Sequence, residues 1–303
     1  MTTTDLSPKG ETRTKFDLQQ YVTDRIMAAI EAGTPPWRKP WTGSAGGAFF
    51  PLRANGVPYR GINVLLLWLE AAEKGYGGAH WFTYRQATEL GAQVRKGERS
   101  STVVKYGTVE RETEAGDEKR IGYLRAYRVF NADQIDGLPK EFARTPNKAQ
   151  DMGTEIDAEL MDFFAGIGVT IETSKDPRAY YDPKVDRIHM PPAETFHSNT
   201  GYFGTLAHES LHATGHKSRL DRFTTCMSRK DVAREELLAE IGGAMLCVAL
   251  GIEPETRQNA AYVSSWLKAL ADDKRLIFTA ASAAQVGVDY IIEAARHADR
   301  EAA

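Results

Sequence analysis

TLAHESLHATGH, residues 205–216, contains the most informative pattern in the second half of the chain. It contains an HExxH pattern, in which His208 and His212 are four residues apart and therefore project from the same face of a helix. Two neutral imidazoles in this arrangement are typical ligands of Zn²⁺, and Glu209 beside them can take the proton of a water molecule that attacks a peptide carbonyl. The stretch predicts a helix that carries a metal site, with Glu209 as the general base.

A third protein ligand is expected on the next helix, REELLAEIGGAML, residues 234–246. Glu236 and Glu240 lie one helical turn apart there, and the small residues that follow them predict close packing of the same face. Buried carboxylates need a compensating charge, which a metal and a ligand histidine would supply. We assign Glu236 as the third ligand and Glu240 as the carboxylate that orients a ligand imidazole, with the reverse assignment as the main alternative. Glu235 is expected to point to solvent or to cap a neighbouring group.

His216 is a competing third imidazole, because it follows His212 by four residues. Gly215 argues against it, since a glycine at that point usually ends a helix, and the longer HExxHxxGxxH pattern would need a histidine where this chain has Ser218. Zn²⁺ is the expected ion, and another divalent metal such as Mn²⁺ is the alternative. The ion could also act only as a structural staple.

Other residues near this pattern have two interpretations each. Tyr180 and Tyr181, in a strand–turn–strand stretch before the helix, could stabilise an oxyanion, although core or edge packing is the simpler interpretation. Arg219 could pair with a carboxylate or with the substrate, or lie on the surface. If no metal binds, His208 and His212 are core histidines and the glutamates form a solvated helix face.

Length and charge predict two domains. A chain of 303 residues is roughly twice the common domain size. Residues 1–145 carry 21 Lys and Arg against 17 Asp and Glu, whereas residues 146–303 carry 17 against 24, so the halves have net charges of +4 and −7. The Pro-, Gly- and Asn-containing segment 136–153 is the expected junction, which gives domains at 1–145 and 154–303. The positive first half suggests an anionic partner.

Periodicity predicts an α+β fold, with a first domain that mixes helices and a hairpin and a second domain in which short strands precede helices. Helix ends are marked by glycine and proline, as after residue 32. In the first domain we expect helices at 16–32, 63–74 and 83–90, and a hairpin of 102–110 with 121–130. In the second we expect helices at 154–167, 203–214, 229–250, 259–270 and 274–296.

The composition predicts a soluble protein of a reducing cytosol. Hydrophobic residues make up 42% and charged residues 26% of the chain, and no apolar run approaches the length that spans a bilayer. The start, MTTTDLSPKGETRTKFD, lacks the apolar core of a secretory signal, and two cysteines do not make a disulfide framework. No membrane partner is expected.

Tryptophan and basic residues are interleaved in the first half, in PPWRKPW, PYRGINVLLLW and HWFTYRQATELGAQVRKGERS, which contain four of the five tryptophans. Unpaired bases can stack on aromatic rings while Arg and Lys neutralise phosphates, so the mixture predicts binding of single-stranded DNA. Packing of the tryptophans in a core is the alternative. The candidate DNA-binding residues are Trp37, Arg38, Lys39, Trp41, Arg53, Tyr59, Arg60, Arg95, Lys96 and Arg99.

Long strings in both halves also carry a family likeness: PWRKPW, PYRGINVLLLW, WFTYRQATELGAQVRKGERSSTVVKYG, YRVFNADQIDGLP, and HESLHATGHKSRL followed by REELLAEIGGAML. In these strings the chain resembles the ArdC-type antirestriction proteins of conjugative plasmids. That family combines an N-terminal single-stranded-DNA-binding domain with a C-terminal zincin-like metallopeptidase domain, and the resemblance implies the same arrangement here. The second half is also similar to metallopeptidases in which a Glu of an ExxxN or ExxxD helix completes HExxH. Glu236 matches that ligand, whereas Glu240 departs from the final Asn or Asp.

Two functions are consistent with these patterns. The resemblance implies an antirestriction protein that binds single-stranded DNA during plasmid transfer and carries a metallopeptidase-like domain. The alternative is a metallopeptidase that cleaves a specific host protein and uses the DNA-binding domain as a targeting module.

Overall fold

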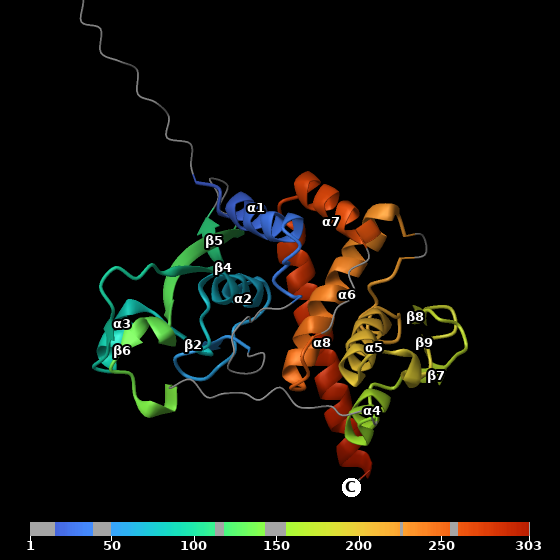
Figure 1. Cartoon of the computed structure of the whole chain (residues 1–303). Helices are drawn as coiled ribbons and strands as arrows, with labels where there is room; N and C mark the ends of the chain where they lie inside the picture. Colours follow the sequence, from blue (N-terminus) through green and yellow to red (C-terminus); the bar gives the residue numbers. More distant parts are fainter. Residues whose placement is uncertain are drawn as a thin grey trace, which may run out of the picture.

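The first half of the chain is built on a four-stranded sheet in the order β1-β2-β5-β4, with helices beside it (Figure 1). The computed structural model describes residues 16–38, 50–112, 118–142, 156–224, 227–254 and 260–302. Strands β1 and β2 pair in parallel, and the other neighbours in this sheet are antiparallel. The elements of this half are α1 (Leu18–Glu31), β1 (Leu52–Arg53), α2 (Ile62–Lys74), β2 (His80–Phe82), α3 (Tyr84–Glu89), β3 (Gln93–Val94), β4 (Ser101–Glu112), β5 (Glu118–Asn131) and β6 (Ile135–Asp136).

Local sequence explains where these helices begin. The Asp17 side chain accepts a hydrogen bond from the backbone N–H of Gln20 at 3.0 Å, and so satisfies one free donor at the start of α1. Thr83 and Gln86 form a reciprocal capping box at the start of α3. The expected helices of this half are therefore present.

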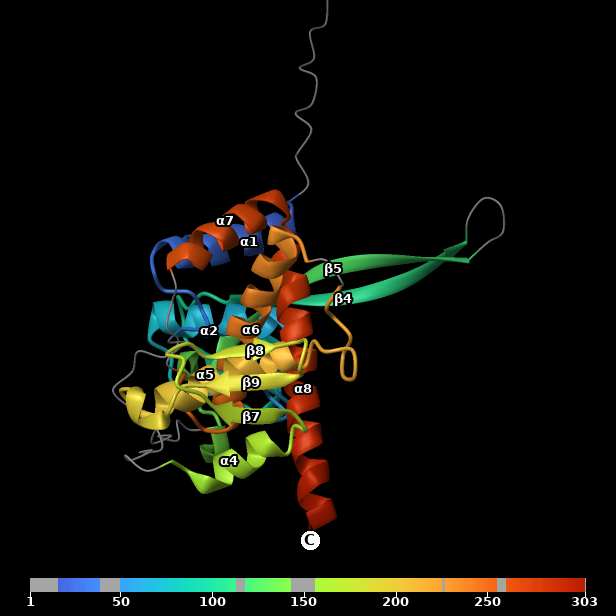
Figure 2. The same cartoon turned by 90° about the vertical axis from the view of Figure 1, so that its right-hand side faces the viewer.

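Strands β4 and β5 form a long hairpin that projects from the body of the molecule (Figure 2). Their register runs from Ser101 opposite Val129 at the root outward along the ribbon. β4 is an edge strand, and the Asn63 amide from α2 both donates to the Val104 carbonyl oxygen, at 2.8 Å, and accepts from the Val104 N–H, at 2.7 Å. These two bonds satisfy the backbone N–H and carbonyl oxygen of Val104 at the edge of the sheet, and they attach the root of the hairpin to α2.

The second half contains a three-stranded sheet in the order β7-β9-β8, in which β7 and β9 are parallel and β8 is antiparallel to β9. Strand β8 lies beside α5, the helix that carries the HExxH pattern. The elements are α4 (Ala158–Ala165), β7 (Thr170–Thr173), β8 (Tyr180–Asp182), β9 (Arg187–Met190), α5 (Asn199–Ala213), α6 (Arg229–Ala249), α7 (Ala260–Asp272) and α8 (Leu276–Ala302). The expected α+β fold class is confirmed.

Helices α5 and α6 are in unusually close contact because glycines lie between them. A Cβ on Gly243 would lie 3.3 Å from the Cα of His208, and one on Gly242 would lie 2.7 Å from the Leu211 side chain. A larger residue would therefore have to displace the Leu211 side chain at position 242 and the backbone of α5 at position 243. The predicted close packing of this face is present, and it brings α6 against the histidine-bearing helix.

The two halves share one hydrophobic core. Val22 and Ile26 of α1 belong to the same buried cluster as Trp266 of α7, and Figure 1 shows α1 beside α7. The ring of Trp37, which follows α1, meets the ring of Trp266 edge-on at 6.2 Å. The expected boundary between the halves falls largely on residues 143–155, outside the described residues, so the limits 1–145 and 154–303 stay a prediction.

Helix α8 is long and apolar over Leu276–Arg300, and it is the one helix among the described residues that matches a membrane span in length and composition. Half of its apolar window is buried inside the molecule. Ile277, Ala281, Ala284 and Ile291 are fully buried in the core. This burial is what a central helix of the core requires, and it accounts for the apolar composition.

Candidate metal centre

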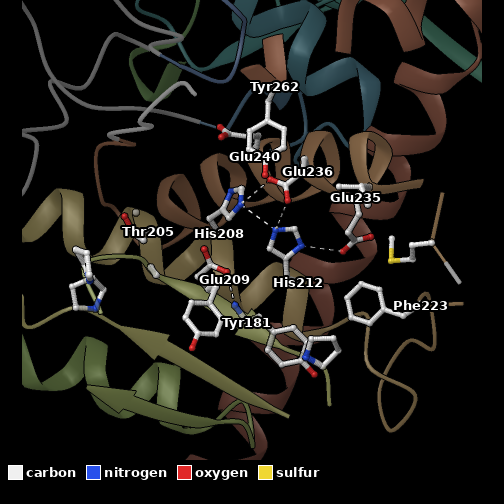
Figure 3. A pocket seen from close by; sticks show the side chains of 18 of the residues that line it. Tyr181, Thr205, His208, Glu209, His212, Phe223, Glu235, Glu236, Glu240 and Tyr262 are labelled. Atoms are coloured by element: carbon white, nitrogen blue, oxygen red, sulfur yellow. Dashed lines mark hydrogen bonds and ion pairs between the residues drawn. The ribbon is translucent and has the colours of Figure 1, made fainter. Parts of the chain in front are cut away.

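The predicted ligands meet in one place, where α5 and α6 face each other (Figure 3). The Nε2 atoms of His208 and His212 are 3.1 Å apart. The two carboxylate oxygens of Glu236 each lie 3.7 Å from one of these nitrogens. One donor atom from each of the three residues lies within 4.8 Å of the others, and none of the three is fully buried. The structure therefore brings together the three residues that the sequence assigned as ligands.

This donor set fits a divalent cation. Two imidazole nitrogens and one carboxylate oxygen are the protein ligands of many catalytic zinc sites, which leave a further position open. Burial acts to lower the pKa of His208, but contact with Glu236 and the charges of Glu209 and Glu240 raise it to about 9. Burial acts to raise the pKa of Glu236, but the nearby histidines outweigh it and hold that pKa below its ordinary value. Surroundings that favour positive charge at this point suit a bound cation.

The structure places Glu235, and not Glu240, against a ligand imidazole, so Glu235 replaces Glu240 as the candidate for the orienting carboxylate. Oε1 of Glu235 lies 3.4 Å from Nδ1 of His212, on the side of the ring away from the other ligands. The same carboxylate pairs with Arg222 at 2.7 Å, and its side chain is only 11% exposed. Glu235 was expected to point to solvent or to cap a neighbouring group. Its contact with Arg222 depends on the loop after α5, which helical spacing does not describe.

Glu240 has a different environment. Its side chain lines the cleft, and its Oε2 atom is buried without a hydrogen-bond partner in the described part of the chain. Burial raises its pKa, although the charge of His208 opposes this shift. Glu240 therefore adds negative potential near His208, but the structure gives it no hydrogen bond to a ligand ring within the described ranges.

Glu209 is held in position by the neighbouring sheet. Its Oε2 atom accepts a hydrogen bond from the backbone N–H of Tyr181 at 2.9 Å, and its side chain is buried beside the ligands. Because the donor is a main-chain group of β8, the position of the carboxylate is set by the fold. This is the placement expected of a general base.

Three of the residues whose role was open, Tyr181, His216 and Arg219, gather around Asp186. Arg219 makes a bidentate ion pair with Asp186 at 2.8 to 3.0 Å, so its pairing with a carboxylate is the interpretation that holds. The Tyr181 hydroxyl donates to the same carboxylate at 2.7 Å, and Nδ1 of His216 lies 3.7 Å from it. Tyr180 stacks on the ring of His189. His216 is thus outside the ligand set, and the Tyr181 hydroxyl is already engaged.

A cleft of about 520 Å³ opens over the ligands. Its wall includes the apolar side chains Phe196, Phe223, Met227 and Val232. Sequence reasoning missed Tyr262, which reaches into the cleft from α7 toward Glu236 and Glu240 (Figure 3).

The environment of Tyr262 is acidic, and its ring is held by a neighbour. The charge of Glu236, burial and the charge of Glu209 raise its pKa above the ordinary value. Its ring stacks on Trp266 at 6.3 Å. The four-residue spacing of Tyr262 and Trp266 was the only available signal, and it does not differ from the spacing of core residues.

The candidate DNA-binding residues do not form one surface. Trp37 is fully buried and Tyr59 is 9% exposed, so neither offers a ring face to a base, and their predicted stacking role is wrong in this conformation. Composition could not show this, because a tryptophan among basic residues can face inward or outward. Lys39 and Trp41 lie outside the described residues. The remaining candidates are exposed basic residues: Arg38, Arg53, Arg60, Arg95, Lys96 and Arg99.

Two of these exposed cations are engaged in ion pairs. Arg60 pairs with Asp289 of α8. Arg95 pairs with Glu98 at 2.9 Å and with Asp136 at 3.3 Å. A phosphate that binds either guanidinium group would therefore compete with a carboxylate partner.

Comparison with known proteins connects this site to a family. Residues 16–130 match the family model described as the N-terminal domain of anti-restriction factor ArdC, and residues 158–283 match a zincin-like metallopeptidase model. A Sinorhizobium fredii protein named y4eC, itself uncharacterized, is 38% identical over 95% of this chain and 94% of its own length. The Escherichia coli DNA primase TraC is 36% identical over 92% of this chain, which spans 27% of that primase.

Two solved structures are more similar still. The metal-free crystal structure of the antirestriction ArdC protein from plasmid R388 is 62% identical, with a TM-score of 0.84, and the match covers 93% of this chain and 99% of that one. Its Mn(II)-bound structure is 61% identical, with a TM-score of 0.80 over 92% and 98%. A divalent metal therefore suits the ligand set of this chain. The chain belongs to the ArdC-type antirestriction proteins, with an ArdC N-terminal domain and a zincin-like metallopeptidase domain.

Proposed function

We propose that this chain is an antirestriction protein that binds single-stranded DNA during plasmid transfer and that its metal centre hydrolyses peptide bonds. The observation that supports the hydrolytic part is the position of Glu209. This carboxylate is held by the Tyr181 N–H and lines the same cleft as the ligands His208, His212 and Glu236. A carboxylate that only supports a metal site usually accepts a hydrogen bond from a ligand imidazole, as Glu235 can from His212. Glu209 is instead held by a main-chain N–H at the cleft, which is where a peptidase needs its general base.

The chain's own residues divide the work as follows. A divalent ion held by His208, His212 and Glu236 would polarise the scissile carbonyl. Glu209 accepts a proton from the attacking water and returns it to the leaving amine. Tyr262 reaches the same cleft, where its hydroxyl can donate to developing negative charge.

Zn²⁺ is the metal we propose, with Mn²⁺ as the alternative. Two imidazoles and one carboxylate form the ligand set typical of zinc peptidases. Mn(II) is the metal named for the R388 relative. Metal analysis of the protein purified without added metal, followed by competition between the two ions, distinguishes these possibilities.

Binding of single-stranded DNA is supported by the family and by the charge of the first half. Residues 1–145 have a net charge of +4, and six of the ten candidate residues are exposed cations in the described part of the chain. Electrostatic binding of this kind weakens with salt, with a slope set by the number of phosphates neutralised.

The test of peptidase involvement is Glu209→Gln, compared with Glu31→Gln, an exposed residue at the end of α1. Loss of a general base lowers the rate of hydrolysis by about 10²–10⁴-fold. We expect Glu209→Gln to keep metal and DNA binding, and to fail to protect an unmodified plasmid transferred into a restricting recipient. Full protection by Glu209→Gln would show that hydrolysis is not needed and would leave DNA binding as the function.

A second candidate function is cleavage of a specific host protein, with the DNA-binding half as a targeting module. The apolar wall of the cleft favours it, because Phe196, Phe223 and Val232 could bind an extended peptide beside the ligands. This function predicts a host protein that disappears on expression of the wild-type chain and persists with Glu209→Gln. A proteome-wide comparison of cleaved peptides measures it.

A further inference from the structure

The part of the β4–β5 hairpin between its root and its middle has a distinctive set of side chains. Residues 105–108 and 122–128 contain no Asp or Glu. They contain three basic residues and three tyrosines, which are Lys105, Arg125, Arg128, Tyr106, Tyr123 and Tyr127. None of these is among the residues that composition singled out as DNA contacts. The hairpin stands clear of the body (Figure 2), so this surface is available to a partner.

The register places two like charges side by side. Lys105 on β4 is directly opposite Arg125 on β5, so both side chains project from the same face of the ribbon. Both are exposed, and in the described ranges neither has a carboxylate partner. Like charges directly opposite each other destabilise a hairpin. An anion bound to this face would offset the repulsion between the two cations.

Tyrosines flank this pair on the same face. Tyr123 is two residues before Arg125 and Tyr127 is two residues after it. The Arg125 guanidinium lies 5.3 Å from the centre of the Tyr123 ring. The same ring covers Gly107, where a Cβ would approach it to 2.5 Å. The cation is therefore held over a fixed ring, with one more ring beside it.

Tyr127 is the ring on this face that is open to a ligand. This residue is 42% exposed. An aromatic ring of this size usually packs against other residues, so this exposure leaves a ring face free for a ligand. An exposed tyrosine next to two cations without carboxylate partners in the described ranges offers both a stacking surface and phosphate neutralisation. These are the two components of single-strand binding sites.

We infer that this ribbon face, defined by Lys105, Tyr123, Arg125 and Tyr127, binds a strand of single-stranded DNA. Lys105 and Arg125 neutralise adjacent phosphates, and an unpaired base stacks on Tyr127. Single strands fit better than duplex, because the flat ring can stack only on a base that is not already covered by neighbours. The inference rests on the proposed single-strand binding and names the place where it occurs.

Fluorescence anisotropy of a labelled poly-dT oligonucleotide with the full-length chain tests this. Each phosphate that the protein no longer neutralises lowers the salt-dependence slope by about 0.7, so the double variant Lys105→Gln/Arg125→Gln should lower it by about 1.4. At roughly 0.1 M salt this corresponds to binding weakened about 25-fold. Tyr127→Ala should weaken binding at least about fivefold with little change in slope.

Thermal unfolding without DNA separates this role from a structural one. Removal of a repulsive cross-strand pair should leave the Tm of the double variant unchanged or higher. A lower Tm would mean that the two cations stabilise the fold, and would contradict the inference. The charge-matched control is Arg85→Gln/Lys140→Gln, two exposed cations of the same half outside the hairpin.

The outcomes distinguish the inference from the function on which it rests. If the wild-type chain binds the oligonucleotide and the hairpin variant binds it equally well, the ribbon face is wrong and single-strand binding stands. Equal weakening by the control pair would also contradict the ribbon face as the binding site, because DNA affinity would then depend only on the total charge of the chain. If the wild-type chain prefers duplex or binds neither form, the proposed DNA function itself fails.

Discussion

The carboxylate of Glu235 should control how tightly the metal centre binds its ion, although it is not a ligand. Oε1 lies 3.4 Å from Nδ1 of His212, and Arg222 holds the carboxylate at 2.7 Å. Arg222 also donates to the Leu211 carbonyl oxygen at 2.8 Å and to the Thr214 hydroxyl at 2.7 Å, so it is fixed to the end of α5. In Glu235→Ala the imidazole loses the group that sets its ring orientation and its basicity.

Loss of such a partner costs about 10–100-fold in metal affinity. This corresponds to roughly 1.4–2.7 kcal/mol. Competition with a chromophoric chelator measures the affinity for Zn²⁺ and Mn²⁺ on the same samples. We expect Glu236→Ala, which removes a ligand, to lose most, Glu235→Ala to lose an intermediate amount, and Glu240→Ala to lose least.

Glu240→Ala is the matched control, because it removes a buried carboxylate of the same helix that has no hydrogen bond to a ligand ring in the described ranges. Unfolding of each metal-free variant gives its stability and shows whether an affinity change comes from a damaged fold. Unchanged metal affinity in Glu235→Ala together with a large loss in Glu240→Ala would falsify the assignment and make Glu240 the orienting carboxylate.

Three further outcomes follow from contacts around the site and the core. Gly243→Ala should lower the free energy of unfolding by about 1–3 kcal/mol and weaken metal binding, because its Cβ would press on the backbone of His208; urea unfolding and chelator competition measure both effects. Asp186→Asn should cost roughly 1.5–3 kcal/mol, since Arg219, only 4% exposed, would lose the charge of its partner, which is itself 31% exposed; an unchanged urea midpoint would contradict this. Burial acts to raise the pKa of Glu70, but its cationic neighbours outweigh it and hold that pKa below its ordinary value of 4.5. Its contribution to stability is therefore complete above about pH 4.5 and is lost as the pH falls through the folded-state pKa, so Glu70→Gln should flatten the acid side of the stability profile in unfolding titrations.

Helices were predictable from this sequence because their signals are local. The expected helix 229–250 is observed as Arg229–Ala249, and the expected 63–74 as Ile62–Lys74. Apolar spacing fixes the body of each helix, and caps such as Ser228 fix the start. The strands Leu52–Arg53 and Gln93–Val94 have only two residues each, too few to show an alternation, and sequence reasoning missed them.

Site residues were predictable where the spacing along one helix determines the geometry. His208 and His212 share a face of α5 by their four-residue separation, and they do converge. The roles of Glu235 and Glu240 depend on how α6 is rotated against α5, which is decided by the glycine contacts between the helices. The spacing of residues within one helix cannot predict how that helix is rotated against its neighbour. Tyr262 was missed for the same reason, because only the tertiary fold brings α7 to the cleft.

The shared core determines how the two proposed activities can be tested. Trp37 belongs to the first half by sequence, yet its ring is fully buried and meets Trp266 of the second half at 6.2 Å. Thr23 of α1 donates a hydrogen bond to the Lys274 carbonyl oxygen across the same contact, at 2.8 Å. A fragment limited to the first half would expose these apolar surfaces to water and lose part of its own core. Point variants of the full chain, such as those on the ribbon face and at Glu209, change one activity and leave this contact in place, so they separate DNA binding from hydrolysis where truncation would disturb both.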